Sequence, residues 1–172
     1  MDRRTFVNMV AAGGASYLLP RAADAHPAPK VRNVVLTHDV FADRSCWSEV
    51  ITRLQAKGMH ATAVQNPLAT LQAGVDATQD VLTLQQDPTV LVAHSFGGKR
   101  GLFADKTTHA AWRSKPSWYA VSTEDRTIDP DLQRFMAKRM GAKTIEVKAS
   151  HLSLISQPDT INNLIVESAG HS

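Results

Sequence analysis

The chain has 172 residues, of which 43% are hydrophobic and 20% are charged, and its formal net charge is +3. This length gives one domain with a substantial core rather than two domains. The small net charge argues against a nucleic-acid partner. Because no apolar run approaches about 18 residues, a multi-pass membrane protein is excluded, and we expect no stable membrane insertion of the mature chain.

The N-terminal segment resembles a twin-arginine export signal. Arg3 and Arg4 are followed by one residue and then by Phe6, and the apolar run over residues 7–19 is too short to span a bilayer. Ala23-Asp24-Ala25 fits a small-x-small cleavage site. We therefore predict an export signal over 1–25, a single domain over 26–172, and a periplasmic or secreted protein. The alternatives are an N-terminus without regular structure and a short membrane anchor.

Strands and helices alternate along the rest of the chain. Runs of β-branched and apolar residues predict five strands, over Asn33–Thr37, Ala61–Val64, Thr89–Ala93, Ser117–Ser122 and Lys143–Lys148. Apolar residues at helical spacing, with turn residues at the ends, predict helices that begin near Ser45, Leu71, Pro130 and Ser156. This alternation indicates an α/β fold, with a parallel sheet of about five strands and helices on both faces.

Three polar residues follow three of the predicted strands closely. Ser95 follows the third strand, Asp125 the fourth and His151 the fifth. Because the carboxyl ends of parallel strands lie at one edge of the sheet, where ligands bind in such folds, we expect these three side chains to lie together.

Four segments resemble the motifs of the α/β-hydrolase family, in the same order. The turn Ala93–Gly97 resembles the nucleophile elbow G-x-S-x-G, with alanine in place of the first glycine. The segments THDVFADRSCW, STEDRTIDP and ASHLSLISQP resemble the oxyanion segment, the acid loop and the histidine loop of that family. The resemblance covers Val31–Ser168 except for roughly residues 99–108. It implies a truncated α/β-hydrolase fold of the small serine esterase and hydroxynitrile lyase branch.

The resemblance also implies a role for each site residue. Ser95 would be the nucleophile, His151 would take its proton, and Asp125 would hold the imidazole and stabilise its protonated form. The backbone N–H groups of Phe96 and Val40 would bind the oxyanion. No cofactor is expected.

Each of these assignments has a simpler rival. A serine directly after a strand is often a helix N-cap, and His151 could be an ordinary loop histidine. Glu124 and Asp129 compete with Asp125 for the role of the acid.

The remaining histidines and the cysteine have no predicted catalytic role. We expect His38 and His94, which flank the site in the motifs, to make structural hydrogen bonds rather than to bind a ligand. The other histidines have no metal-ligand spacing, so no metal site is predicted. Cys46 is the single cysteine, so it cannot form an internal disulfide, and it is given no role.

The sequence departs from the family pattern at two places. The glycine expected after His38 is Asp39, whose carboxylate would oppose the transition state, be kept protonated, or point to solvent. Pro116 follows only 18 positions after Gly98, which leaves room for a helix but neither a cap nor a further strand. The fourth predicted strand could then pair directly with the third, and the pocket would be shallow.

These observations favour a serine hydrolase that cleaves a small ester through an acyl-enzyme intermediate. The first alternative is a catalytically dead relative with at most weak ligand binding. The second is amidase, thioesterase or lyase chemistry with the same three residues. A sheet edge left by a lost strand would also favour a homodimer.

Overall fold

The computed structural model describes residues 6–9, 31–95 and 111–170. Its strands are β1 (Phe6–Met9), β2 (Asn33–Thr37), β3 (His60–Val64), β4 (Thr89–Ala93), β5 (Trp118–Ser122) and β6 (Lys143–Val147). Its helices are η1 (Arg44–Trp47), α1 (Ser48–Ala56), α2 (Leu71–Thr83), η2 (Ala111–Arg113), α4 (Pro130–Met140), α5 (Ser153–Ser156) and α6 (Pro158–Ser168). The five predicted strands and the α/β class are confirmed.

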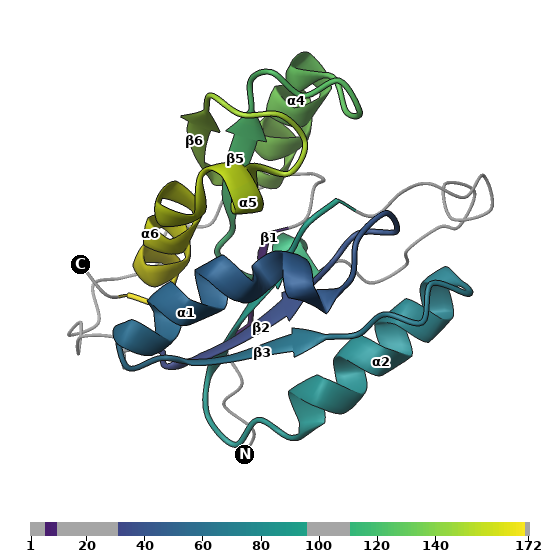
Figure 1. The fold of residues 1–172 in the computed structure, drawn as a ribbon, viewed down its shortest axis with the longest axis vertical. Helices are drawn as coiled ribbons and strands as arrows, with labels where there is room; N and C mark the ends of the chain where they lie inside the picture. Colours follow the sequence, from purple (N-terminus) through teal and green to yellow (C-terminus); the bar gives the residue numbers. More distant parts are fainter. Residues whose placement is uncertain (1–5, 10–30, 96–110, 171–172) are drawn as a thin grey trace.

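All strand pairs that the structure describes are parallel, in two sheets. One sheet has the order β1-β4-β2-β3, and the other pairs β5 with β6. Pairing of β5 directly with β4, which the short connection suggested, is therefore wrong. The second edge of β4 is instead paired with β1, and β1 also lies against β5 (Figure 1).

The strand Phe6–Met9 thus lies between β4 and β5 in space, although no strand was predicted for this segment. These four residues belong to the predicted export signal. They cannot both leave with a cleaved signal and pair with β4 in the folded protein, so the domain boundary at residue 25 stays a prediction.

The core lies between the β2-β3-β4 strands and the helices. All five residues of β2 are buried, which is typical of a parallel strand covered on both faces. Val34 and Leu36 belong to the same core cluster as Val50 and Leu54 of α1. Helices α1 and α6 pack together, whereas α2 packs against β2 and β3 from the other side (Figure 1). Because helices cover both faces of this sheet, we look for a functional site at the ends of its strands.

Local capping explains where the helices begin and end. The first helical segment begins close to Ser45, as predicted, and Asp43 caps it: its Oδ1 accepts a hydrogen bond from Ser45 N at 2.7 Å. Asp129 caps α4, and Pro130, near which this helix was predicted to begin, is its first residue. Gly141 ends α4 with φ +62°, a conformation that favours glycine.

Helix α4 does not bury the face that its apolar residues suggest. Leu132 and Phe135 are exposed, whereas Gln133, Ala137 and Met140 are buried. The helix therefore turns a glutamine inward, whose side chain accepts a hydrogen bond from Ser122 N and donates one to Asp125 Oδ2.

Among the described residues, no helix is both long and apolar enough to cross a membrane.

The packing of α1 makes a direct prediction about stability. Leu54 is 0% exposed, whereas Leu84 is 76% exposed. Leu54→Ala should lower the free energy of unfolding by about 2–5 kcal/mol, because it removes buried methyl groups and leaves a cavity. Leu84→Ala makes the same chemical change at the surface and should cost less than about 0.5 kcal/mol. Urea unfolding of both variants measures the difference; equal losses would contradict this account of the core.

Candidate active site at the carboxyl edge of the sheet

Ser95 lies one residue beyond His94, in the turn that follows β4. Its φ is +27°, which side chains other than glycine rarely adopt. His94 N donates to Thr37 O at 3.1 Å, so the hydrogen-bond ladder between β4 and β2 continues up to the residue before Ser95. A serine with positive φ directly after a strand of a parallel sheet is one feature of a nucleophile elbow.

Asp125 and His151 meet at the ends of β5 and β6. His151 Nδ1 lies 2.8 Å from Asp125 Oδ2, so a hydrogen bond joins the two side chains. Both are largely shielded from water, with side chains 15% and 3% exposed. Since a carboxylate only accepts, Nδ1 carries the proton and Nε2 of the neutral ring has a free lone pair.

A cage of donors holds the Asp125 carboxylate. Its Oδ1 accepts from the backbone N–H of Thr127 (2.7 Å) and Ile128 (3.1 Å), and its Oδ2 also accepts from Gln133 Nε2 (2.8 Å). Burial acts to raise the pKa of Asp125, but the hydrogen bonds to His151, Ile128 and Thr127 outweigh it and lower this pKa below its ordinary value of 3.8. Asp125 is therefore an anion at neutral pH.

The two competing acids have other contacts. Glu124 is largely exposed and lies 3.9 Å from Lys148 Nζ. Asp129 accepts from the backbone N–H groups at the start of α4. Of the three candidates, the structure brings Asp125 to His151.

His94 and Asp39 complete the cluster. His94 Nε2 lies 2.8 Å from His151 O, and the rings of the two histidines are 4.8 Å apart. Asp39 Oδ1 accepts from Phe41 N at 2.6 Å, while Oδ2 lies 3.4 Å from His151 Nε2. Burial lowers the pKa of His94 below 6.5 against the opposing effect of its hydrogen bond to His151, so its ring is neutral at pH 7.

Asp39 therefore does not point to solvent, since it is fully buried within the site. His38 makes structural hydrogen bonds as expected: its Nε2 accepts from Asn66 N at 2.9 Å, and its Nδ1 lies 2.7 Å from Asp39 O. Asn66 Nδ2 donates in return to His38 O at 2.9 Å. These bonds fix the turn that carries Asp39 against the end of β3.

The predicted oxyanion residues are only partly described. Val40 lies half-buried in the turn after β2. Phe96 lies outside the described residues, as do the basic residues that follow Gly98 in the sequence.

Cys46 lies close enough to Asp39 for the charge of this residue to affect the pKa of its thiol. Burial, followed by the charge of Asp39, raises the pKa of its thiol from 9.0 to about 11.

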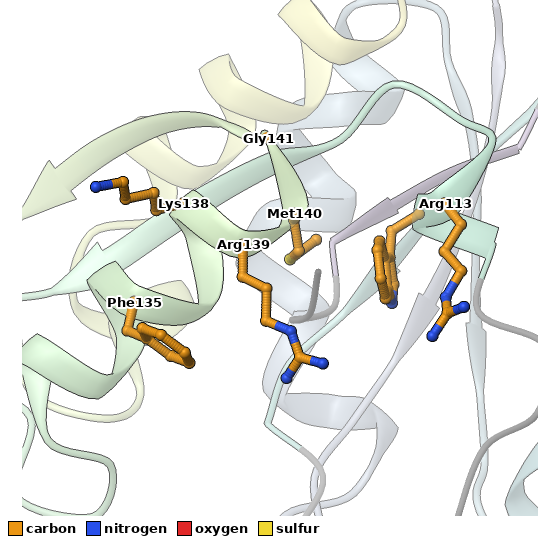
Figure 2. A pocket seen from close by; sticks show the side chains of 7 residues that line it. Arg113, Phe135, Lys138, Arg139, Met140 and Gly141 are labelled. Atoms are coloured by element: carbon orange, nitrogen blue, oxygen red, sulfur yellow. The ribbon is translucent and has the colours of Figure 1, made fainter. Parts of the chain in front are cut away.

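A separate hollow of about 580 Å³ lies between η2 and the end of α4. Phe135 and Arg139 extend from α4 on one side, and Arg113 lies across from them (Figure 2). None of Ser95, Asp125 and His151 lines this hollow, so it is not the site at the carboxyl edge.

Comparisons with known proteins agree with this arrangement. Residues 99–164 match the alpha/beta hydrolase family, and this match includes residues 99–108, which the sequence motifs left out. The fold is similar to a pyrethroid hydrolase from Sphingobium faniae JZ-2 (TM-score 0.69, 12% identity, 81% of this chain and 98% of that chain). It is also similar to polyneuridine aldehyde esterase (TM-score 0.68, 14% identity, 80% and 98%) and to the ydeN gene product of B. subtilis (TM-score 0.67, 16% identity, 81% and 100%). No curated protein matches the chain.

The fold is thus of the α/β-hydrolase type, and the segment over residues 99–164 matches the alpha/beta hydrolase family. The strands that the structure describes divide into two sheets.

Sequence reasoning missed Gln133 and Asn66. Gln133 Oε1 accepts from Ser122 N at 3.0 Å, while its Nε2 donates to Asp125, so one amide ties the end of β5 to the acid. A signal for it existed, because Gln133 shares the helical register of Met136, Ala137 and Met140 and is the polar residue in that series.

The role of Gln133 is open to a direct test. Gln133→Leu keeps a similar volume but leaves Ser122 N and one lone pair of Asp125 without a partner. We expect a loss of about 1–3 kcal/mol in the free energy of unfolding. Gln72→Leu, at an exposed position, should cost less than about 0.5 kcal/mol. Urea titrations of the two variants measure the difference. If Gln133→Leu leaves the free energy of unfolding unchanged, the positioning role of Gln133 is refuted.

The raised pKa of Cys46 predicts an unreactive thiol. At pH 8 its thiolate fraction should be about 100-fold lower than for a thiol of pKa 9.0, because the shift spans two pH units. Iodoacetamide should therefore alkylate the folded chain about 100-fold more slowly than the same chain in urea. Because folding raises the pKa of this thiol, the free energy of unfolding should decrease as the pH rises above 9, where the thiol of the unfolded chain ionises and that of the folded chain does not. Equal alkylation rates would contradict the buried environment.

Proposed function

We propose that this protein hydrolyses a small ester through an acyl-enzyme intermediate on Ser95. The observation that carries the proposal is the Asp125–His151 hydrogen bond of 2.8 Å, whose histidine is joined through its backbone oxygen to His94, the residue before a serine with φ +27°. The fold similarity to a pyrethroid hydrolase and an esterase supports the choice of reaction class.

The steps follow from the chemistry of these groups. Ser95 Oγ attacks the ester carbonyl carbon while His151 Nε2 takes its proton, and Asp125 stabilises the imidazolium that forms. The backbone N–H groups of Phe96 and Val40 stabilise the oxyanion. The imidazolium then protonates the leaving alcohol. Water attacks the acyl carbon, giving its proton to His151, and the acid leaves as Ser95 regains its proton.

The contact between nucleophile and base is itself part of the proposal. Among the described residues, His151 Nε2 has no hydrogen-bond partner, so its lone pair is available to a serine hydroxyl. Such hydrogen bonds often tighten only when substrate binds.

Apolar side chains beside the site favour a substrate with an apolar acyl or alcohol group. Phe41 follows Asp39 by two residues and is 73% exposed, and Leu152 is adjacent to His151 and 37% exposed. Both offer surface that an ester could cover.

The rival function is ligand binding without hydrolysis, and Asp39 is the observation that favours it. Its Oδ2 lies 3.4 Å from His151 Nε2. An anion at that position would attract the proton that His151 must pass to the leaving group, and would compete with Ser95 for the ring nitrogen.

The test is labelling of the full chain with a fluorophosphonate probe, together with turnover of short p-nitrophenyl esters. Ser95→Ala should abolish labelling and reduce turnover by at least about 1000-fold, because the attacking oxygen is removed. Ser156→Ala, at an exposed serine, is the matched control and should label as the parent chain does.

A folded chain that is not labelled and hydrolyses none of these esters would refute the proposal in favour of the binding function. Labelling that persists in Ser95→Ala would place the nucleophile elsewhere.

A further inference from the structure

Three buried polar atoms of the site converge, and none of them has a hydrogen-bond donor among the residues that the structure describes. Asp39 Oδ2, His94 Nδ1 and His151 Nε2 each have no hydrogen-bond partner among the described residues. Oδ2 lies 3.4 Å from His151 Nε2 and 3.8 Å from His94 Nδ1, and all three atoms lie within 4.8 Å of one another. The side chain of Asp39 is only 1% exposed. Unpaired buried polar atoms are costly, so three that face one another require a cation or protons among them.

The other ring nitrogens determine that these atoms are acceptors. His94 Nε2 is bonded to the carbonyl oxygen of His151, and His151 Nδ1 is bonded to the carboxylate of Asp125. Both partners can only accept, so in the neutral rings the protons are on those nitrogens. His94 Nδ1 and His151 Nε2 then each carry an unshared lone pair, and both nitrogens lie close to Asp39 Oδ2.

We propose that Asp39, His94 and His151 form a binding site for a divalent transition-metal ion of the zinc type. Four-coordinate zinc holds nitrogen and carboxylate oxygen at roughly 2.0–2.2 Å, which separates its ligand atoms by roughly 3.3–3.5 Å. The observed 3.4 and 3.8 Å are close to that geometry, so small side-chain movements complete it.

The surroundings match those of zinc ligands in other respects. Histidine ligands almost always donate their second N–H to a carboxylate or a backbone carbonyl, and here one histidine does each. Two imidazole nitrogens with one carboxylate favour a transition metal over Ca²⁺ or Mg²⁺, which prefer oxygen ligands. Three protein ligands leave a fourth position for water or a substrate oxygen.

The metal and the serine mechanism would compete for one atom. If the proposed function holds, a metal on His151 Nε2 removes the lone pair that accepts the Ser95 proton. Zn²⁺ should then inhibit ester hydrolysis over the same concentration range in which it binds.

The test measures binding directly on the full, chelator-treated chain. Co²⁺ titration followed by visible absorption, with Zn²⁺ competition, should give one ion per chain. Asp39→Asn and His94→Gln should each weaken binding by about 10-fold or more, because each removes a ligand. His60→Gln changes an exposed histidine and should bind as the parent does. Cys46→Ser should also bind normally, since the thiol is not among the converging atoms.

A second readout needs no substitution at the ligands. In the Ser95→Ala chain, ¹⁵N signals of the His94 and His151 rings should shift together on addition of Zn²⁺, whether or not the parent hydrolyses esters. Failure of the proposed function and failure of the metal site are thereby distinguished.

Absence of saturable binding, or ring signals unmoved by Zn²⁺, would overturn the site and leave a shared proton as the partner of Asp39. Binding that survives both ligand substitutions but is lost in His60→Gln would locate the ion at the surface instead.

Discussion

The hydrogen bond from His94 Nε2 to His151 O, 2.8 Å long, is the contact on which the site depends. It runs from the end of β4 to the loop after β6, and these strands belong to sheets that are not paired with each other. In a continuous sheet, backbone pairing would fix the relative positions of Ser95 and His151. Here the His94 side chain holds the end of β4 to the loop after β6, and the packing of α6 against α1 also joins the two sheets.

This arrangement explains why so many polar groups of the site are structural. His38 and Asn66 fix the turn that carries Asp39, and Gln133 fixes the acid to the end of β5. A buried network of polar groups stabilises a fold when every group has a hydrogen-bond partner, whereas a buried group without one costs free energy. Among the described residues, the site therefore combines hydrogen-bonded groups with unpaired acceptor atoms on Asp39, His94 and His151, and that contrast marks where chemistry or a ligand is to be sought.

Asp39 is the residue with the most influence on what the site can do. The family motif that this segment resembles has glycine at this position, which carries no carboxylate. A buried carboxylate 3.4 Å from His151 Nε2 changes the electrostatic balance of this histidine. The proposed proton transfer and the proposed cation binding would both use His151 Nε2, so this atom cannot serve both at once.

Much of this protein could be predicted from its sequence alone. Hydrophobic periodicity and turn residues located the five strands and the start of α4, because those signals are local. The chain order of Ser95, Asp125 and His151 predicted that each residue follows a strand, and the structure brings Asp125 and His151 into contact. Tertiary structure alone decided which acid meets His151, that β1 rather than β5 pairs with β4, and that Asp39, His94 and His151 converge. Residues 39, 94 and 151 share no sequence spacing, so only the packing of three loops brings them together.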